Sequence, residues 1–118
     1  MTDNVLNSFT MQGKRALITG GAGVLCKAIA RGLAQAGAEV ILADLRGEAA
    51  DAAAKELTDE GFKASGVTMN VLDPAGIRKI ADDIEAQGGL DILVLSEAGS
   101  WRHGWPGKQH LKVSVRQP

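Results

Sequence analysis

The fold of this chain is decided by the stretch Arg15-Ala16-Leu17-Ile18-Thr19-Gly20-Gly21-Ala22-Gly23. Its first five residues contain the short apolar run Ala16-Leu17-Ile18 and are typical of a buried strand. The glycines then form a tight turn, and a segment with Leu25, Ile29 and Leu33 at four-residue spacing follows. This spacing places the three side chains on one face of a helix, which Gly37 ends. The stretch therefore predicts a strand, a glycine turn and a helix.

The alternation of short apolar strands and amphipathic helices continues along the chain. This order predicts an α/β fold, a partial Rossmann-like doubly wound parallel sheet with strand order 3-2-1-4. In the second helix, a slim apolar face of small residues favours close packing on the sheet. The further strands are predicted at 39–43, 64–71 and 90–95, and the further helices at 47–60 and 74–87.

Length and composition are typical of one globular domain. The 118 residues are 45% hydrophobic and 23% charged, and 13 Lys and Arg oppose 14 Asp and Glu. A net charge of −1 speaks against a nucleic-acid partner, and no apolar run is long enough to predict a membrane span. The start at Met1 lacks a signal-peptide pattern, and the single cysteine, Cys26, suits the reducing cytoplasm.

The glycine turn is the place where chemistry is expected. The backbone N–H groups of such a turn and the positive end of the next helix attract a phosphate. Gly20, Gly21 and Gly23 let a pyrophosphate approach without a Cβ in the way. Asp44 follows Gly20 by 24 residues, close to the ~20 residues expected for an acid that binds the ribose 2′-OH. The pattern predicts a dinucleotide site that favours NAD over NADP; alternatively, the glycines only form a turn and Asp44 caps the next helix.

Several short motifs resemble the short-chain dehydrogenase/reductase family. The motifs are residues 13–21, Ala28-Ile29-Ala30, Asp44 and Asn70-Val71-Leu72-Asp73. The resemblance covers about residues 10–95 and corresponds to the cofactor-binding half of the family fold. It implies an NAD-dependent oxidoreductase that acts on an alcohol or a carbonyl of a small molecule. The segment Gly23-Val24-Leu25 is similar to a branch that acts on sugar acids, such as mannonate or fructuronate oxidoreductases.

The resemblance also assigns contacts to the cofactor. It implies that Leu25 packs near the cofactor and that the amide oxygen of Asn70 accepts a hydrogen bond from the adenine amino group. Ala98 and Gly99 match the end of the Asn-Asn-Ala-Gly motif of the family. No metal ligand is assigned. The predicted cofactor-binding residues are Gly20, Gly21, Gly23, Leu25, Asp44, Asn70, Val71, Ala98 and Gly99.

The sequence departs from the family pattern at two places. Val24 and Cys26 stand where the motif Thr-Gly-x-x-x-Gly-x-Gly has its later glycines, and the larger Cys26 side chain is expected to strain the helix–strand crossing. The family reaction uses a tyrosine as general acid and base, and this chain has no tyrosine. No catalytic residue is therefore assigned. The alternatives are a catalytically inactive truncated remnant, a nucleotide-binding module, or an S-adenosylmethionine-dependent methyltransferase.

The composition changes abruptly near residue 96. Residues 1–95 carry 9 basic and 13 acidic side chains, whereas residues 96–118 carry 4 and 1 together with both tryptophans and both histidines. We divide the chain into an N-terminal arm (1–12), an NAD(P)-binding domain (13–95) and an irregular, non-native tail (96–118), as after a frame shift or a miscalled gene end. With such a tail, the strand at 90–95 would keep an open edge, which predicts self-association.

Overall fold

The computed structural model describes residues 12–20, 23–70, 72–97 and 110–115. Strands and helices alternate through most of this part of the chain, and its last two described elements are both strands. The elements are β1 (Arg15–Thr19), α2 (Val24–Gln35), β2 (Glu39–Asp44), α3 (Gly47–Asp59), β3 (Ala64–Thr68), α4 (Pro74–Ala86), β4 (Ile92–Glu97) and β5 (His110–Val115).

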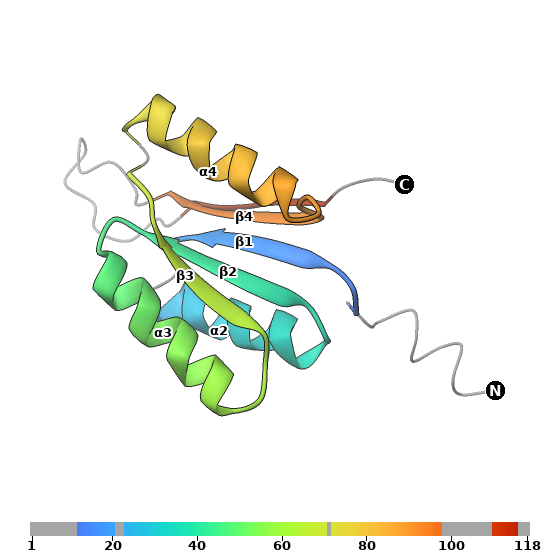
Figure 1. Cartoon of the computed structure of the whole chain (residues 1–118). Helices are drawn as coiled ribbons and strands as arrows, with labels where there is room; N and C mark the ends of the chain where they lie inside the picture. Colours follow the sequence, from blue (N-terminus) through green and yellow to red (C-terminus); the bar gives the residue numbers. More distant parts are fainter. Residues whose placement is uncertain (1–11, 21–22, 71, 98–109, 116–118) are drawn as a thin grey trace.

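The strands form one sheet in the order β3-β2-β1-β4-β5. The first four pair in parallel, with Leu17 of β1 opposite Ile41 on one side and Leu93 on the other. Helices α2 and α3 lie on one face of the sheet, and α4 lies on the other (Figure 1). The predicted α/β fold with strand order 3-2-1-4 is confirmed.

Strand β5 differs from the expectation of an irregular tail. It pairs antiparallel with β4, with Ser114 opposite Leu93. The sequence of residues 110–115 alternates polar and apolar residues, the period that a strand requires. The edge of β4, which was expected to be open, is therefore paired, and β4 starts at Ile92 rather than at residue 90. The predicted arm (1–12) falls almost wholly outside the described residues, as do residues 98–109.

Two apolar clusters hold the helices on the sheet. On the face of α2 and α3, Ile18, Val40, Leu42 and Val94 are almost fully buried. On the opposite face, Ile84 of α4 packs in a cluster with residues of β1 and β2. No described helix is both long and apolar enough to cross a membrane.

The buried face of α2 differs from the predicted one. Its fully buried residues are Cys26, Ala30 and Ala34, whereas Ile29 and Leu33 are partly buried beside them. Small side chains under the helix allow its backbone to approach the sheet, and the larger side chains fill the space at the flanks. In α3 the slim apolar face is confirmed, and its buried residues are Ala50, Ala53, Ala54 and Leu57.

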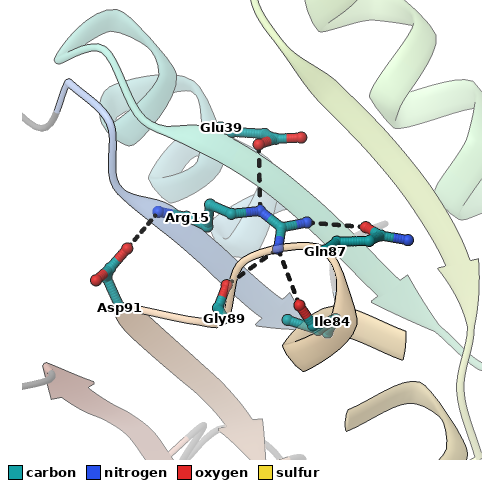
Figure 2. A network of polar contacts seen from close by, with 6 residues as sticks. All are labelled: Arg15, Glu39, Ile84, Gln87, Gly89 and Asp91. Carbon is teal, nitrogen blue, oxygen red and sulfur yellow. Dashed lines mark hydrogen bonds and ion pairs between the residues drawn. The ribbon is translucent and has the colours of Figure 1, made fainter. Parts of the chain in front are cut away.

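Arg15 joins three elements at the amino end of the sheet (Figure 2). Its Nη1 donates to the carbonyl oxygens of Ile84 (3.1 Å) and Gly89 (3.0 Å), at the end of α4 and in the loop that follows. Its Nη2 donates to Gln87 Oε1 at 3.0 Å, and its Nε donates to Glu39 Oε2 at 3.2 Å. The last turn of α4 contains no basic residue, so the Arg15 guanidinium supplies the positive charge that a helix C-terminus attracts.

Candidate functional site

Gly20 and Gly23 are the two described residues of the turn between β1 and α2. Gly20 adopts a φ of +68°, which a residue with a side chain rarely adopts, and the Gly23 N–H donates to the Gly20 carbonyl at 2.9 Å. A Cβ on Gly23 would lie 3.3 Å from that carbonyl oxygen. Gly23 is the N-cap of α2, which has neither a side-chain cap nor an acidic residue in its first turn. The N-terminus of α2, with its positive dipole end and the N–H groups of its first turn, thus has no side-chain cap among the described residues and is suited to a ligand phosphate.

Cys26 is accommodated directly behind this turn. Its side chain is buried, and its Sγ donates a hydrogen bond to the Thr19 carbonyl at 3.4 Å. Thr19 is itself buried, and its Oγ1 donates to the Val94 carbonyl at 3.4 Å. The strain that was expected at Cys26 is therefore not supported, because the side chain is buried in the apolar cluster between the sheet and the helices α2 and α3, and its sulfur has a hydrogen-bond partner.

Asp44 ends β2 at the same edge of the sheet as the glycine turn. Its Oδ1 accepts a hydrogen bond from the Arg46 N–H at 3.0 Å, two residues further along the chain. Arg46 is the N-cap of α3 and makes no side-chain capping bond itself. Asp44 therefore stabilises the turn before α3, but it is not the N-cap of that helix, which the alternative interpretation expected it to be. The half-buried carboxylate nevertheless lies at the edge where the dinucleotide was predicted.

Asn70 follows β3 at the same edge, in a turn that leads to α4. The Met69 N–H donates to the Asp44 carbonyl at 2.9 Å, which places Asn70 directly beside the end of β2. Asn70 Oδ1 accepts from the Leu72 N–H at 2.9 Å, and its backbone carbonyl accepts from the Asp73 N–H at 3.0 Å. The helix then starts with Asp73 as N-cap and Pro74 in its first turn, as the sequence indicates.

Exposed apolar side chains gather along this carboxyl edge. Val24 and Leu25 at the start of α2 are 89% and 44% exposed, and Leu45 and Leu72 after β2 and β3 are 66% and 87% exposed. Apolar faces at the end of a parallel sheet are suited to the flat rings of a ligand. Leu45 and Leu72 were not among the predicted contacts. Leu45 directly follows β2, which was a visible signal, whereas Leu72 lies four residues after the end of β3.

The structure brings five predicted cofactor residues to one edge. They are Gly20, Gly23, Leu25, Asp44 and Asn70. The other four, Gly21, Val71, Ala98 and Gly99, lie outside the described residues.

A cavity of about 300 Å³ lies elsewhere, between α2 and α3. It is lined by Leu42, Ala53 and Leu57 together with polar groups from both helices, and none of the predicted cofactor residues lines it. Beside it, Lys27 pairs with Glu56 at 3.4 Å, and Arg31 pairs with Glu60 at 2.6 Å. The hydrogen bond to Glu60 raises the pKa of the Arg31 guanidinium. Within the described ranges, no cluster of His, Cys, Asp or Glu is suited to hold a metal ion.

A sequence profile of short chain dehydrogenases matches residues 14–110. The chain belongs to the short-chain dehydrogenase family. Its similarity extends to the 3-oxoacyl-acyl-carrier-protein reductase FabG of Aquifex aeolicus, which is 43% identical over 107 residues, 89% of this chain and 41% of the relative.

Solved structures of short-chain dehydrogenases share this fold. A putative D-mannonate oxidoreductase from Haemophilus influenza with bound NAD is 40% identical, with a TM-score of 0.68 over 76% of this chain and 32% of that chain. A gluconate 5-dehydrogenase from Burkholderia cenocepacia in complex with NADP and tartrate is 35% identical, with a TM-score of 0.69 over 84% of this chain and 41% of that chain. The present chain spans about a third of the length of the first curated relatives that it matches.

Proposed function

We propose that this chain binds a nicotinamide adenine dinucleotide across the carboxyl edge of its sheet and favours NAD over NADP. The observation that carries the proposal is the uncapped N-terminus of α2, behind the Gly20 turn and on the same edge as Asp44. The residues fit the group because the N-terminus of α2 has no side-chain cap, and because a Cβ on Gly23 would lie 3.3 Å from the Gly20 carbonyl oxygen and crowd the turn in front of it. The NAD-bound and NADP-bound relatives support a nicotinamide cofactor.

Each element of the edge has a distinct role in this proposal. The glycine turn and the N-terminus of α2 bind the pyrophosphate, and the Asp44 carboxylate accepts hydrogen bonds from the ribose hydroxyls. Leu25 and Leu45 offer apolar surface to the rings and exclude water from them. When bound, the nicotinamide ring supplies hydride chemistry.

Cofactor choice is the direct test. Titration calorimetry with NAD⁺ and NADP⁺ should give tighter binding of NAD⁺, because a 2′-phosphate would face the Asp44 carboxylate. Asp44→Ala should reduce the ratio of the NADP⁺ to the NAD⁺ dissociation constant by about tenfold. This is the effect of removing one close like-charge contact at a partly exposed site. Asp82→Ala removes an exposed carboxylate of α4 and should leave the difference unchanged. Equal binding of both cofactors by the unaltered chain would refute the role of Asp44.

We further propose that these 118 residues bind the cofactor without transferring hydride. The chain contains no tyrosine, the residue type that serves as general acid and base in the family. The sugar-acid class remains our proposal for the whole protein's substrate, supported by relatives named for D-mannonate and gluconate. The chain with NAD⁺ and D-mannonate should give no NADH absorbance above that of a heat-denatured sample. NADH formation would refute the non-catalytic proposal and support the sugar-acid class.

We also propose that the chain associates with itself through the edges of its sheet. The two outermost strands in the described sheet are β3 and β5, and each has one side without a neighbouring strand. Such edges are templates for pairing with another chain. Sedimentation velocity over a hundredfold range of concentration should show the mass rising with concentration. A single monomer throughout would contradict this proposal.

A further inference from the structure

The cavity of about 300 Å³ between α2 and α3 lies on the face of the sheet away from α4 (Figure 1). Its floor is apolar and is formed by the buried side chains of Leu42 in β2 and of Ala53 and Leu57 in α3. On the α2 side, Gly32 leaves the space open, because a Cβ built on this residue meets no atom within 4 Å. An apolar cavity of roughly 150 Å³ accepts a benzene ring. The space between the helices is therefore large enough for one ring together with a polar head group.

The charged residues that line this cavity carry both signs. Lys27 and Arg31 stand one turn apart on α2, and Glu56 belongs to α3. The ion pair between Lys27 and Glu56 is 3.4 Å long, and its side chains are 41% and 55% exposed, so the pair opens at little cost. Arg31 donates to both carboxylate oxygens of Glu60 from its Nη1 alone. The donors on its Nε and Nη2 are therefore not used by that pair.

This set of groups suits a small molecule that carries both charges beside an apolar side chain. A carboxylate near Lys27 and Arg31 has two cations within one helical turn, and an ammonium group has Glu56 as its partner. A ligand with a carboxylate alone would draw Lys27 away from Glu56 and leave that acid without compensation. A ligand with an ammonium group alone would lie beside two cations. A zwitterion satisfies all three side chains, and its apolar part covers the floor.

We propose that the cavity between α2 and α3 binds a free apolar α-amino acid of the size of phenylalanine. The α-carboxylate accepts hydrogen bonds from Arg31 and Lys27, the α-ammonium group donates to Glu56, and the side chain packs over Leu57. This inference goes beyond the proposed function and does not depend on it, because none of the predicted cofactor residues lines the cavity.

Titration of the isotope-labelled full chain with L-phenylalanine, followed by amide NMR shifts, tests the site directly. The shifts should be concentrated at Gly32, Gln35 and Glu56, with a dissociation constant of about 1 mM or lower. Two analogues each lack one charge: 3-phenylpropanoate has no ammonium group, and phenethylamine has no carboxylate. Each analogue should bind about fivefold more weakly than phenylalanine, the effect of losing one partly exposed charge pair.

Two variants with matched controls test the space and the charge separately. Gly32→Leu places a side chain in the cavity and should abolish the shifts, while the gain in helix propensity favours folding. Ala52→Leu adds a leucine side chain at an exposed position of α3 outside the lining and should bind phenylalanine as the unaltered chain does. Glu56→Gln should remove the preference for phenylalanine over 3-phenylpropanoate. Glu48→Gln, which is also exposed and outside the lining, should keep this preference.

The outcomes separate this inference from the proposed function. The inference is overturned if the folded unaltered chain shows no amide shifts at about 10 mM phenylalanine, or if all three ligands bind equally. Unchanged phenylalanine binding in Gly32→Leu also overturns it, and if circular dichroism shows that this variant does not fold, Glu56→Gln decides. The phenylalanine shifts should be the same with and without NAD⁺, and failure of NAD⁺ to bind overturns the proposed function alone.

Discussion

Replacement of Arg15 by methionine tests the polar network at the amino end of the sheet. Methionine keeps the apolar stem of the side chain and removes every donor of the guanidinium. The backbone pairing of residue 15 remains, with its N–H donating to Asp91 Oδ2 at 3.0 Å and its carbonyl accepting from the Asp91 N–H at 2.9 Å. The substitution therefore isolates the four side-chain hydrogen bonds.

The expected loss of stability in Arg15→Met follows from how deeply each hydrogen-bond partner of Arg15 is buried. The Arg15 side chain is 12% exposed, whereas that of Glu39 is 41% exposed, so their ion pair contributes less than about 1 kcal/mol. The bond to Gln87 is exposed and also contributes little. The bonds to the carbonyls of Ile84 and Gly89 are partly buried and come from a charged donor. Together the four bonds should contribute about 3 kcal/mol, a large share of the roughly 5–10 kcal/mol expected for a domain of this size.

The assay is urea unfolding followed by circular dichroism. Arg15→Met should lower the free energy of unfolding by about 3 kcal/mol with an unchanged denaturant slope, and Glu39→Gln should lower it by less than about 1 kcal/mol. Arg78→Met, an exposed arginine of α4, should stay within about 0.5 kcal/mol of the unaltered chain. A loss at Arg15 no larger than that at Arg78 would show that water replaces the guanidinium without cost, and the reasoning would be refuted.

Three further substitutions test the packing of the glycine turn and of α3. Cys26→Gly should lower the free energy of unfolding by about 1–2 kcal/mol in the same assay, since it removes a buried side chain and places glycine, which has a lower helix propensity, in α2; an increase in the free energy of unfolding would restore the strain hypothesis. Gly66→Ala should cost about 1–3 kcal/mol by urea unfolding, because its Cβ would lie 2.8 Å from the backbone of Ala50 and Asp51 in α3; a neutral result would show that α3 moves freely on β3. Gly20→Ala should cost about 1–2 kcal/mol through its φ of +68° and should weaken NAD⁺ binding in calorimetry; unchanged binding would argue against this turn as the pyrophosphate site.

The parallel sheet could be predicted because its signals are local. Strands β1, β2 and β4 each contain a short apolar run. The glycine turn, Gly37 and the Asp73-Pro74 pair mark the boundaries between strands and helices. The face of α2 was assigned to Leu25, Ile29 and Leu33 because hydropathy ranks leucine and isoleucine above alanine. The structure buries Cys26, Ala30 and Ala34 instead, since the closeness of helix and sheet, rather than hydrophobicity, selects the residues under the helix.

The missed features depend on residues far apart in the sequence or on the shape of one turn. Arg15 lies 69 positions before Ile84 and 74 before Gly89, so no local pattern reveals that it binds the end of α4. Strand β5 lies within a segment set apart by composition, and charge and tryptophan content gave no information about pairing. At the site, Asp44 and Asn70 could be placed at one edge from the ends of their strands. The orientation of the Asn70 amide required the hydrogen bond to Leu72.

The central position of β1 has a consequence for the order of folding. As the chain grows, β1 meets β2 after the short crossover through α2, but its other neighbour, β4, lies about 76 positions later, at Ile92 opposite Ala16. Closing a longer loop costs more chain entropy, so the β1–β2–β3 half with α2 and α3 is favoured to assemble first. Until β4 pairs with it, one side of β1 has no strand partner. The partners of Arg15 in and after α4 arrive at the same late stage. The hydrogen bonds of Arg15 to α4 and the loop after it therefore form after the β1–β2–β3 half has assembled. Loss of the Arg15 side chain should accelerate unfolding more than it slows refolding.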